Sequence, residues 1–474
     1  MKNLVLILFL SVFIMSCGDK VEQTNQIKKP NIVYVFADQW REESMGYAGN
    51  PDVKTPNLDK LASEGVNFMN AISTIPVCTP HRAMMLTGQY PLKNGMFMND
   101  VSLDPDAQSF GKLYKQNGYD TAYIGKWHVD GNGRSAFIPK ERRQGFDYWE
   151  VLECSHEYNN SNYWGNDDQL HSWKGYDAAA QTQDAISYIK AHAKNDSPFV
   201  LMLSWGPPHA PYNTAPKEFQ ELYKNIDIQL RPNVPNDLAE KTKAILKGYY
   251  AHCSALDSYI GQLQAAIKRS NIEDNTIFVF TSDHGDMINS HGQSKKQRIY
   301  QESAKVPFII KYPALMGNNG KKSDFLINTL DILPTMLGMS GLNVPDDLDG
   351  EDITTVILGQ KEDDRKASLV ASIQPFGQWN RAIGGKEFRG VITKKYTYAK
   401  DLSGEWLFFD NVEDPYQLNN LIENPSFKSI AKNLDELLGK ELNRLDDEFL
   451  PGAYYIEKWG YKVDATGTVP YRNK

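Results

Sequence analysis

Cysteine is scarce in this sequence, with four residues among 474. Two of them, Cys17 and Cys78, stand in the motifs described below. Only Cys154 and Cys253 are therefore left to form a disulfide. The sequence allows either a bond between these two or a pair of buried free thiols.

An excess of positive charge is also absent, because 51 Lys and Arg residues stand against 59 Asp and Glu residues, a net charge of −8. This balance argues against a nucleic-acid-binding surface. It does not exclude an anionic substrate, because a local basic pocket can coexist with an acidic surface. Internal repeats and low-complexity tracts are absent too. With 41% hydrophobic residues the chain has ample core for two to three domains, or for one large and one small domain.

Long apolar runs are confined to the N-terminus. Residues 4–15 form an apolar stretch too short to span a bilayer, and no later stretch is apolar enough to be a transmembrane helix. Ile14-Met15-Ser16-Cys17 resembles a bacterial lipoprotein processing box, in which the cysteine becomes the lipidated first residue. A cleaved signal peptide without an anchor and an uncleaved anchor are the alternatives. We expect a targeting segment at 1–17, a tether at 18–30, and an exported protein, periplasmic or anchored to a bacterial outer membrane.

Apolar runs of strand length alternate with helical patterns through most of the chain. We expect strands at 31–37, 120–124, 198–204, 276–280 and 306–312, helices at 55–64, 78–88, 107–117, 177–194 and 238–268, and long loops at 130–176. Continuous apolar runs are typical of buried parallel strands. The alternation predicts an α/β fold with a large, mainly parallel sheet sandwiched by helices.

The last quarter of the chain has a different pattern. Alternating segments at 387–399 and 405–409 flank a turn, and a helical pattern covers 426–442. These features predict a smaller C-terminal α+β subdomain with an antiparallel sheet. We expect a catalytic domain at 31–362 and this subdomain at 363–474.

Ionisable residues follow four of the predicted strands. Asp38, Lys126, His209 and Asp283 each follow the C-terminal end of an apolar run. In open α/β sheets the carboxyl edge of the strands carries the ligand. The alternative is that these are four separate solvated loop residues. We expect instead that the sheet brings them together in one site.

Cys78 stands just before the start of a short apolar helix, in which Pro80 suits the first position, Arg82 lies about one turn along and Gly88 can cap the end. Free N–H groups, the helix dipole and a guanidinium converge at its start and form an anion site. A thiol at such a position suggests a nucleophile for a phosphate-like or sulfate-like ester. A buried structural cysteine before a core helix is the alternative.

Asp38, Gln39, Asp283 and His284 form a plausible set of divalent-metal ligands. Carboxylate and amide oxygens favour a hard cation, Ca²⁺ or Mg²⁺ first. His284 is a softer ligand that leaves room for another metal, and it could also be a hydrogen-bonded histidine beside the ion. A ring of cationic side chains would surround an anionic ester: Arg82, Lys126, His128, His209 and a lysine near 296.

Taken with the motifs around them, these residues resemble the type I sulfatases of the alkaline phosphatase superfamily. Cys78-Thr79-Pro80-His81-Arg82 matches the C-x-P-x-R core of that family, and Leu86-Thr87-Gly88 follows as expected. Further family motifs stand in the expected order between about residues 30 and 425: Gly125-Lys126-Trp127-His128, Pro208-His209-Ala210-Pro211-Tyr212, Ser282-Asp283-His284-Gly285 and Asp331-Ile332-Leu333-Pro334-Thr335.

The resemblance implies an alkaline phosphatase-like fold and a mechanism. In that family a separate maturation enzyme oxidises the cysteine to formylglycine, which at position 78 would hydrate and attack sulfur. The metal would be held by Asp38, Gln39, Cys78, Asp283 and His284. The roles implied for the other residues are charge stabilisation by Arg82, sulfate binding by Lys126 and Lys296, leaving-group protonation by His209 shared with Lys296, and proton removal by His128.

The sequence departs from the family pattern at three positions. His81 replaces the commonest serine, Gln39 a more usual aspartate and His284 a more usual asparagine. The last two changes leave the identity of the metal open, with Ca²⁺ our first choice. The choice of Lys296 over Lys295 rests on spacing alone.

Two other functions compete with a sulfatase. A phosphonate monoester or phosphodiester hydrolase of the same superfamily would share the formylglycine site, and a non-catalytic lipoprotein that binds sulfated glycans would not need the full charged ring. A tyrosine-phosphatase-like cysteine enzyme does not fit, because its arginine lies six positions after the cysteine, where this chain has Met84.

The export signal and the loop-rich middle favour a sulfated carbohydrate as substrate, either a glycosaminoglycan fragment or an algal polysaccharide fragment. The expected partners are this saccharide, a transient formylglycine-generating enzyme and a membrane only through Cys17, with no nucleic acid. Five residues are candidate sugar contacts that could equally be structural: Trp164, His171, Trp379, Arg381 and Arg389.

Overall fold

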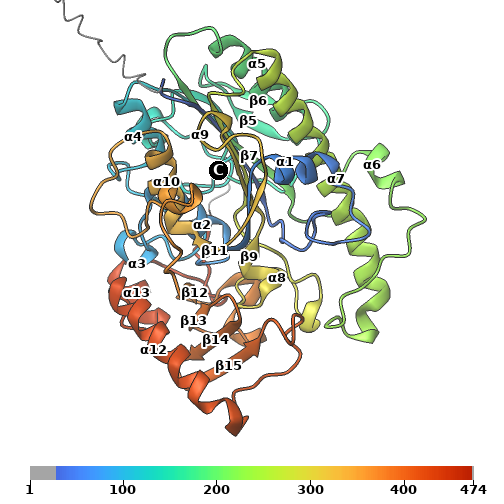
Figure 1. Ribbon diagram of the computed structural model, residues 1–474, viewed down its shortest axis with the longest axis vertical. Coiled ribbons are helices and arrows are strands. Elements are labelled where there is room, and N and C mark those ends of the chain that lie inside the picture. The colour runs from blue at the N-terminus through green and yellow to red at the C-terminus, as the bar shows by residue number, and fades with distance from the viewer. Residues whose placement is uncertain (1–27, 472–474) are drawn as a thin grey trace, which may run out of the picture.

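The computed structural model describes residues 28–471, so the processing box at Cys17 lies outside the described residues. Its main feature is an eleven-stranded sheet with the order β11-β2-β10-β8-β1-β7-β3-β4-β5-β6, in which β9 pairs with β2 (Figure 1). The strands are β1 (Asn31–Asp38), β2 (Val66–Ile72), β3 (Asp120–Lys126), β4 (Tyr148–Leu152), β5 (Asn162–Trp164), β6 (Leu170–Ser172), β7 (Phe199–Pro208), β8 (Thr276–Ser282), β9 (Lys305–Val306), β10 (Phe308–Lys311) and β11 (Lys321–Asn328).

The centre of this sheet is parallel, as the apolar runs predict. Strand β1 pairs in parallel with β7 and β8, and β3 pairs in parallel with β7 and β4. Strand β10 is antiparallel to both of its neighbours. Because β1, β3, β7 and β8 point the same way, their carboxyl ends meet at one edge of the sheet.

Helices cover both faces of the sheet, which confirms the predicted fold class. Alternate residues of β1 enter two different cores: Val33 and Val35 pack with α1, α5 and α7, whereas Tyr34 and Phe36 pack with α2, α4 and α10. The helices are α1 (Pro56–Glu64), α2 (Cys78–Thr87), α3 (Pro91–Asn94), α4 (Phe110–Gln116), α5 (Asp177–His192), α6 (Lys217–Glu221), α7 (Ala239–Arg269), α8 (Gln301–Ala304), α9 (Pro313–Met316), α10 (Ile332–Met339), α11 (Thr354–Ile357), α12 (Lys428–Arg444) and α13 (Gly452–Lys458).

A second, four-stranded antiparallel sheet is formed by β12 (Ser368–Ser372), β13 (Phe388–Ile392), β14 (Tyr396–Asp401) and β15 (Gly404–Asp410). Helix α12 packs on it, as the helical pattern at 426–442 predicts (Figure 1). The hydrophobic core between α12 and the four-stranded sheet is continuous with the core on the α2 side of the large sheet. The domain limits of 31–362 and 363–474 stay a prediction.

Several strands were not predicted from the sequence. The segment 130–176 contains β4, β5 and β6, which extend the sheet, where we expected loops alone. The run at 306–312 is divided between β9 and β10. Strands β2, β11 and β12 were not predicted, because short strands that mix polar and apolar residues do not give a clear periodicity.

The remaining cysteines do not form a disulfide. Cys154 and Cys253 are both buried free thiols, which decides between the two alternatives that the sequence allowed. Among the described residues, no helix has the length and apolar character needed to cross a membrane.

Candidate active site

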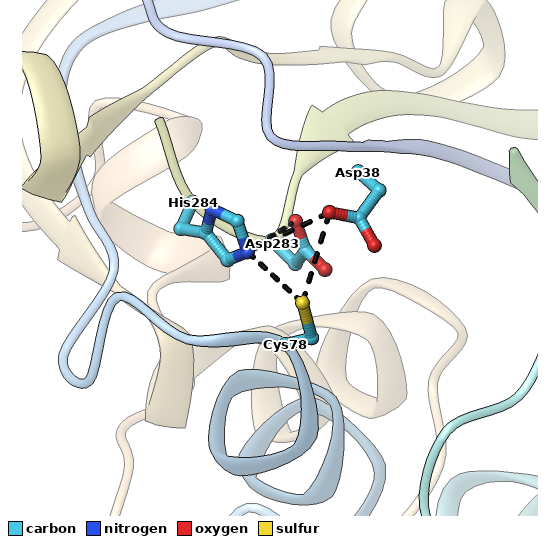
Figure 2. Close-up of side chains that lie close together, drawn as sticks. All are labelled: Asp38, Cys78, Asp283 and His284. Atoms are coloured by element: carbon cyan, nitrogen blue, oxygen red, sulfur yellow. Dashed lines mark hydrogen bonds and ion pairs between the residues drawn. The ribbon is translucent and has the colours of Figure 1, made fainter. Parts of the chain in front are cut away.

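Four side chains that could bind a metal meet at the carboxyl edge of the large sheet (Figure 2). Asp38 ends β1, Asp283 and His284 follow β8, and Cys78 opens α2. One ligand atom from each lies within 4.8 Å of the others, and all four residues are buried. The parallel register of β1 and β8 therefore brings Asp38 beside Asp283, although the two residues lie 245 positions apart in the sequence.

Helix α2 presents Cys78 to the cluster. The helix begins at Cys78 itself, so Pro80 is its third residue and not its first, as the sequence suggested. Proline is still tolerated there, because the N–H groups of a first turn have no intrahelical acceptor. Gly88 ends the helix with a φ of 64°, a left-handed conformation that glycine adopts at little cost.

Arg82 lies one turn along α2 and ties the two carboxylates together. Its Nη2 lies 3.3 Å from Asp38 Oδ2 and 3.0 Å from Asp283 Oδ2. Its Nη1 donates to Ser204 Oγ within β7 and to the carbonyl of Lys126 at the end of β3. The guanidinium thus links residues of four segments in a fixed arrangement, which preorganises the site.

Two lysines bring positive charge to the thiol. Lys296 Nζ lies 3.3 Å from Cys78 Sγ, and Lys126 Nζ forms an ion pair with Asp38. Burial and Asp38 act to raise the pKa of Cys78, but Lys126, Lys296 and His284 outweigh them and hold it well below its ordinary value. The structure therefore stabilises negative charge at the end of side chain 78.

The alternative at Lys295 is excluded by geometry. Lys295 has a φ of 67° and places its Nζ 5.4 Å from the centre of the Tyr212 ring. Lys296 points into the site, where it also donates to Gln39 Oε1 over 2.9 Å. The lysine that can contact an ester is Lys296.

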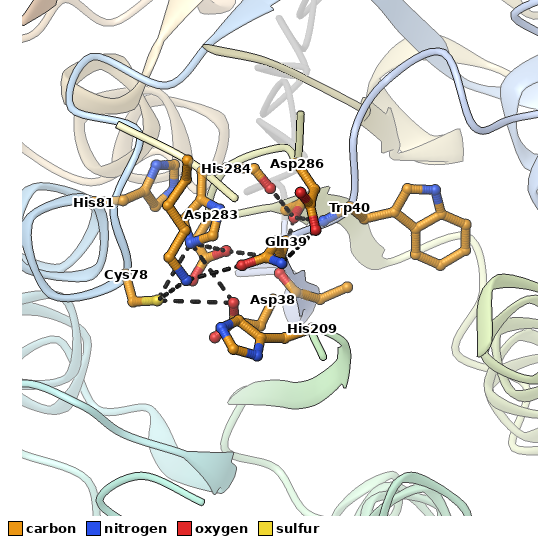
Figure 3. Close-up of polar contacts among 12 residues, drawn as sticks. Asp38, Gln39, Trp40, Cys78, His81, His209, Asp283, His284 and Asp286 are labelled. Atoms are coloured by element: carbon orange, nitrogen blue, oxygen red, sulfur yellow. Dashed lines mark hydrogen bonds and ion pairs between the residues drawn. The ribbon is translucent and has the colours of Figure 1, made fainter. Parts of the chain in front are cut away.

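Gln39 is held in one orientation (Figure 3). Its backbone has a φ of 70°, and its N–H donates to Asp283 Oδ1 over 3.0 Å. Its amide nitrogen donates to Asp286 Oδ2, which also accepts from the hydroxyl of Tyr212. Since the nitrogen faces Asp286, the amide oxygen faces Lys296 and the metal-ligand cluster.

His284 presents Nε2 to the same cluster. Its Nδ1 lies 2.9 Å from the carbonyl oxygen of Gly285, to which it donates, and Nε2 lies 3.2 Å from Cys78 Sγ. A backbone carbonyl that fixes the tautomer in this way leaves Nε2 free to bind a cation. The residues present therefore fit a divalent ion: two carboxylates, an oriented imidazole and an oriented amide oxygen.

His209 stands beside Asp38 at the end of β7 and does not contact Cys78 (Figure 3). Its Nδ1 donates to the carbonyl of Ala210 over 2.8 Å, which leaves Nε2 available. His156 stacks on its ring with a centroid distance of 4.4 Å. Burial and the charge of Lys296 lower the pKa of His209 well below its usual value.

His128 lies on the β3 side of the site, in a loop with a φ of 61°. The Glu153 carboxylate accepts the N–H groups of His128, Asp130 and Gly131 and fixes this loop. Burial acts to lower the pKa of His128, but Cys154 and Asp100 outweigh burial and raise it. Among the described residues, His128 forms no polar contact with Cys78.

Comparison with known proteins decides the family. The sulfatase family model matches residues 30–342, and a model described as the C-terminal region of N-sulphoglucosamine sulphohydrolase matches 289–444. An ulvan-active sulfatase of Formosa agariphila is 44% identical over 96% of this chain and 89% of its own length. The chain belongs to the sulfatase family.

Other relatives agree with this assignment. An endo-4-O-sulfatase of Bacteroides thetaiotaomicron is 31% identical over 93% of this chain and 96% of its own length. A solved structure from a study of glycosaminoglycan metabolism in the same bacterium has a TM-score of 0.80 at 30% identity, and covers 94% of this chain and all of the other. The phosphonate monoester hydrolase of Agrobacterium radiobacter has a TM-score of 0.72 at 20% identity, over 94% of this chain and all of its own, and so shares the fold. The chain is thus a sulfuric ester hydrolase with an alkaline phosphatase-like fold.

Several residues around the sulfatase site were missed by the sequence reading. Asp286 and Tyr212 orient Gln39, His156 stacks on His209, and Glu153 fixes the His128 loop. Tyr212 ends one of the family motifs and Asp286 directly follows another, so their positions in the sequence could have indicated that they lie at the site. Glu153 and His156 lie in the loop-rich segment, where no pattern distinguishes them.

The candidate sugar contacts have different surroundings in the sulfatase. Arg389 is fully buried and forms an ion pair with Asp447, so it is a structural residue and not a sugar contact. Arg381 is paired with Glu387, and His171 with Asp167. Trp164 donates its indole N–H to the carbonyl of Ser135, and Trp379 lines a cavity described below.

Proposed function

We propose that this sulfatase hydrolyses a sulfate ester on a sulfated saccharide, using a formylglycine made from Cys78 and a divalent metal, with Ca²⁺ as first choice. The saccharide substrate is supported by the names of two relatives, an ulvan-active sulfatase and an endo-4-O-sulfatase. An algal polysaccharide fragment and a glycosaminoglycan fragment are the two substrate classes to test.

The position of Cys78 is the observation that carries this proposal. Its Sγ lies 3.3 Å from Lys296 Nζ, 3.2 Å from His284 Nε2 and 3.7 Å from Asp38 Oδ1, at the first residue of a buried helix. A side-chain oxygen at this place would be stabilised as an anion and directed at an ester held by the lysines. A thiol needs no such convergence of cations if its only role is to fill a core.

Asp38, Asp283, His284, the Gln39 amide oxygen and side chain 78 would hold the metal. When bound, it supplies Lewis-acid stabilisation of negative charge on side chain 78 and on the sulfate group. Lys126 and Lys296 bind sulfate oxygens, and Arg82 keeps the carboxylates aligned and stabilises negative charge on side chain 78 together with the metal. A hydrated aldehyde at position 78 offers one hydroxyl to attack sulfur and a second hydroxyl whose later deprotonation releases sulfate.

His209 protonates the sugar oxygen as the bond from sulfur to that oxygen breaks. Its low pKa leaves it neutral in the resting site. The arrival of an anionic ester beside it adds negative charge, which raises the pKa of the imidazole and allows it to carry a proton. Lys296, which reaches the same region, shares this task.

His128 helps to remove the proton from the second hydroxyl. The Glu153 carboxylate holds its backbone, and Thr79 Oγ1 donates to its carbonyl over 2.7 Å, which couples the His128 loop to α2. Since no direct contact with side chain 78 exists, a water molecule would have to relay the proton.

We also propose that the protein is exported. In one case Cys17 carries a lipid that anchors it in a bacterial outer membrane, and in the alternative case the protein lies unanchored in the periplasm. A formylglycine-generating enzyme would act on the Cys78 segment before α2 is buried, because every residue of that helix is buried in the fold. Labelling with radioactive palmitate in cells, with Cys17→Ser as control, tests the anchor.

The decisive experiment uses protein made with a maturation enzyme. Peptide mass should show residue 78 lighter than cysteine by the change from thiol to aldehyde. Sulfate release should then be measured on a panel of sulfated saccharides and on a phosphate diester, with and without a chelator and with Ca²⁺ or Mg²⁺ restored. Release from no saccharide together with good diester turnover would overturn the proposal, as would full activity with an unconverted Cys78.

A further inference from the structure

Arg298 differs from every other buried arginine in the described residues. Four of them, Arg41, Arg82, Arg143 and Arg389, form ion pairs with carboxylates. Arg298 is 5% exposed, yet it forms no ion pair with an acidic side chain among residues 28–471, and burial lowers its pKa more than the charge of Asp286 raises it. A buried cation without an ion-pair partner is costly, because the protein does not fully replace the solvation that it loses.

The hydrogen-bond acceptors that fix the position of Arg298 are uncharged. Its Nε donates to Gln293 Oε1 over 2.7 Å, and its Nη1 donates to the carbonyl of Lys296. Its guanidinium carbon lies 4.5 Å from the centre of the Trp379 ring. In the described part of the chain Nη2 has no acceptor, so one guanidinium nitrogen is left for a ligand.

Arg298 lines a cavity of about 380 Å³ formed by the segment 292–300, which follows β8, and by residues of the C-terminal region. Its walls include Tyr300, Trp379 and Trp406, with Ile383 at 62% exposure on the rim. The volume falls in the ordinary range of ligand pockets, roughly 300–1,000 Å³. Aromatic walls with one charged group are the composition expected where the apolar face of a sugar packs and its anionic substituent is recognised.

The cavity belongs to the same segment as the catalytic lysine. Lys296 reaches Cys78, and its own carbonyl accepts the hydrogen bond from Arg298 two residues later. An oligosaccharide whose sulfate ester lies against Lys296 could therefore place a neighbouring sugar unit in this cavity.

Building on the function proposed above, we infer that the cavity at Arg298, Trp379 and Trp406 binds a sugar unit next to the one that carries the scissile sulfate, and that Arg298 recognises an anionic substituent on it. A carboxylate and a second sulfate share this chemistry. Each offers oxygen atoms that accept charge-assisted hydrogen bonds from a guanidinium. The sulfatase would accordingly prefer substrates with charge on two adjacent units.

The kinetic test uses disaccharides that carry one sulfate ester at the cleaved position. The neighbouring unit carries a carboxylate, the same carboxylate reduced to an alcohol, a second sulfate, or no charge. We expect kcat/KM of the wild type to be about 10- to 100-fold higher for one of the charged neighbours, since a charged hydrogen bond is at stake. Which of the two is preferred identifies the anion.

Arg298→Gln should reduce this preference to within about threefold, mainly through KM. The matched control is Arg269→Gln, an exposed arginine at the end of α7, which should keep the wild-type preference. Trp406→Ala, which removes another aromatic ring of the cavity lining, should weaken binding of every disaccharide and decides the matter if Arg298→Gln does not fold. Wild type without preference, or Arg298→Gln with the preference intact, would overturn the inference.

Calorimetry separates this inference from the proposed function. A sulfate-free disaccharide with a carboxylate should bind to the wild type and lose about 10-fold in affinity or more with Arg298→Gln. The same measurement is made with a disaccharide that carries a sulfate only on the neighbouring unit. If no saccharide releases sulfate but this binding depends on Arg298, the proposed reaction fails and the cavity inference stands. If sulfate is released but both disaccharides bind equally well to the wild type and to Arg298→Gln, the proposed reaction stands and the cavity inference fails.

Discussion

Two fully buried arginines of this sulfatase have different surroundings. Arg389 in the C-terminal sheet pairs with Asp447, which also accepts from the hydroxyls of Tyr90 and Tyr455. Arg82 at the edge of the large sheet pairs with Asp38 and Asp283, and it shares them with Lys126 and His284.

The charge balance of the two clusters shows what each is for. One guanidinium faces one carboxylate around Arg389, and its Nη1 is satisfied by the carbonyls of Ser372 and Phe388. The Arg82 cluster adds Lys126 and Lys296 and a cysteine at the end of a helix dipole, so it has cationic groups left over for an anionic substrate. A cluster in which positive and negative charges balance stabilises the fold, whereas a cluster with excess positive charge can bind an anionic substrate and take part in its reaction.

Replacement of each arginine by methionine tests this contrast directly. Arg82→Met should lower kcat by about 10³- to 10⁵-fold, the range found when an arginine that stabilises a transition state is lost. Arg389→Met should leave activity per folded molecule intact but cost about 3–5 kcal/mol of unfolding free energy, because Asp447 is left as a buried unpaired charge. Steady-state kinetics and urea unfolding measure the two effects. Equal losses of activity in both variants would show that the two clusters do not differ in their role in catalysis.

His209→Ala should lower sulfate release from a saccharide by about 10²- to 10⁴-fold, since a positioned acid contributes that much. A nitrophenyl sulfate has a leaving group that needs no proton, so its turnover should fall far less. The ratio of the two losses is the measurement. Similar losses on both substrates would show that His209 binds the ester and does not protonate the sugar.

The neighbouring lysines provide a closely matched pair. Lys296→Met should cost about 10²- to 10³-fold in kcat/KM, the usual effect of losing one charged contact to a developing anion. Lys295→Met should change activity by no more than about threefold, because its Nζ lies over Tyr212. An equal loss in the two variants would contradict the orientation of this segment.

The smallest expected effect is a pH dependence of the Arg389 cluster. Burial acts to raise the pKa of Asp447, but Arg389 and the hydrogen-bond donors outweigh it and hold the pKa below the ordinary value. A carboxylate whose pKa is lower in the folded protein contributes stability above its unfolded pKa of about 4, and that contribution is lost as pH falls through the folded value.

Wild type and Asp447→Asn should therefore differ most in unfolding free energy near pH 6, and the difference should shrink by about 1–2 kcal/mol near pH 3. Urea unfolding at both pH values measures it. A difference that does not change with pH would show that the pair with Arg389 does not determine the ionisation of Asp447.

The sequence alone determined which residues reach the catalytic edge. Asp38, Lys126, His209 and Asp283 each follow an apolar run, and parallel strands deliver their carboxyl-end residues to one edge whatever the details of packing. The C-x-P-x-R segment likewise determined that Cys78 and Arg82 share one helical turn, because that distance is set by the helix itself.

Only the tertiary structure decided how individual side chains are used. Backbone angles at positive φ turned Lys295 toward Tyr212 and left Lys296 in the site, and Asp286 oriented the Gln39 amide. Arg389 and Arg298 are chemically identical in the sequence, yet Asp447 forms an ion pair with the first and no described carboxylate forms one with the second. Such differences depend on partners brought from distant segments, and local sequence patterns carry no information about them.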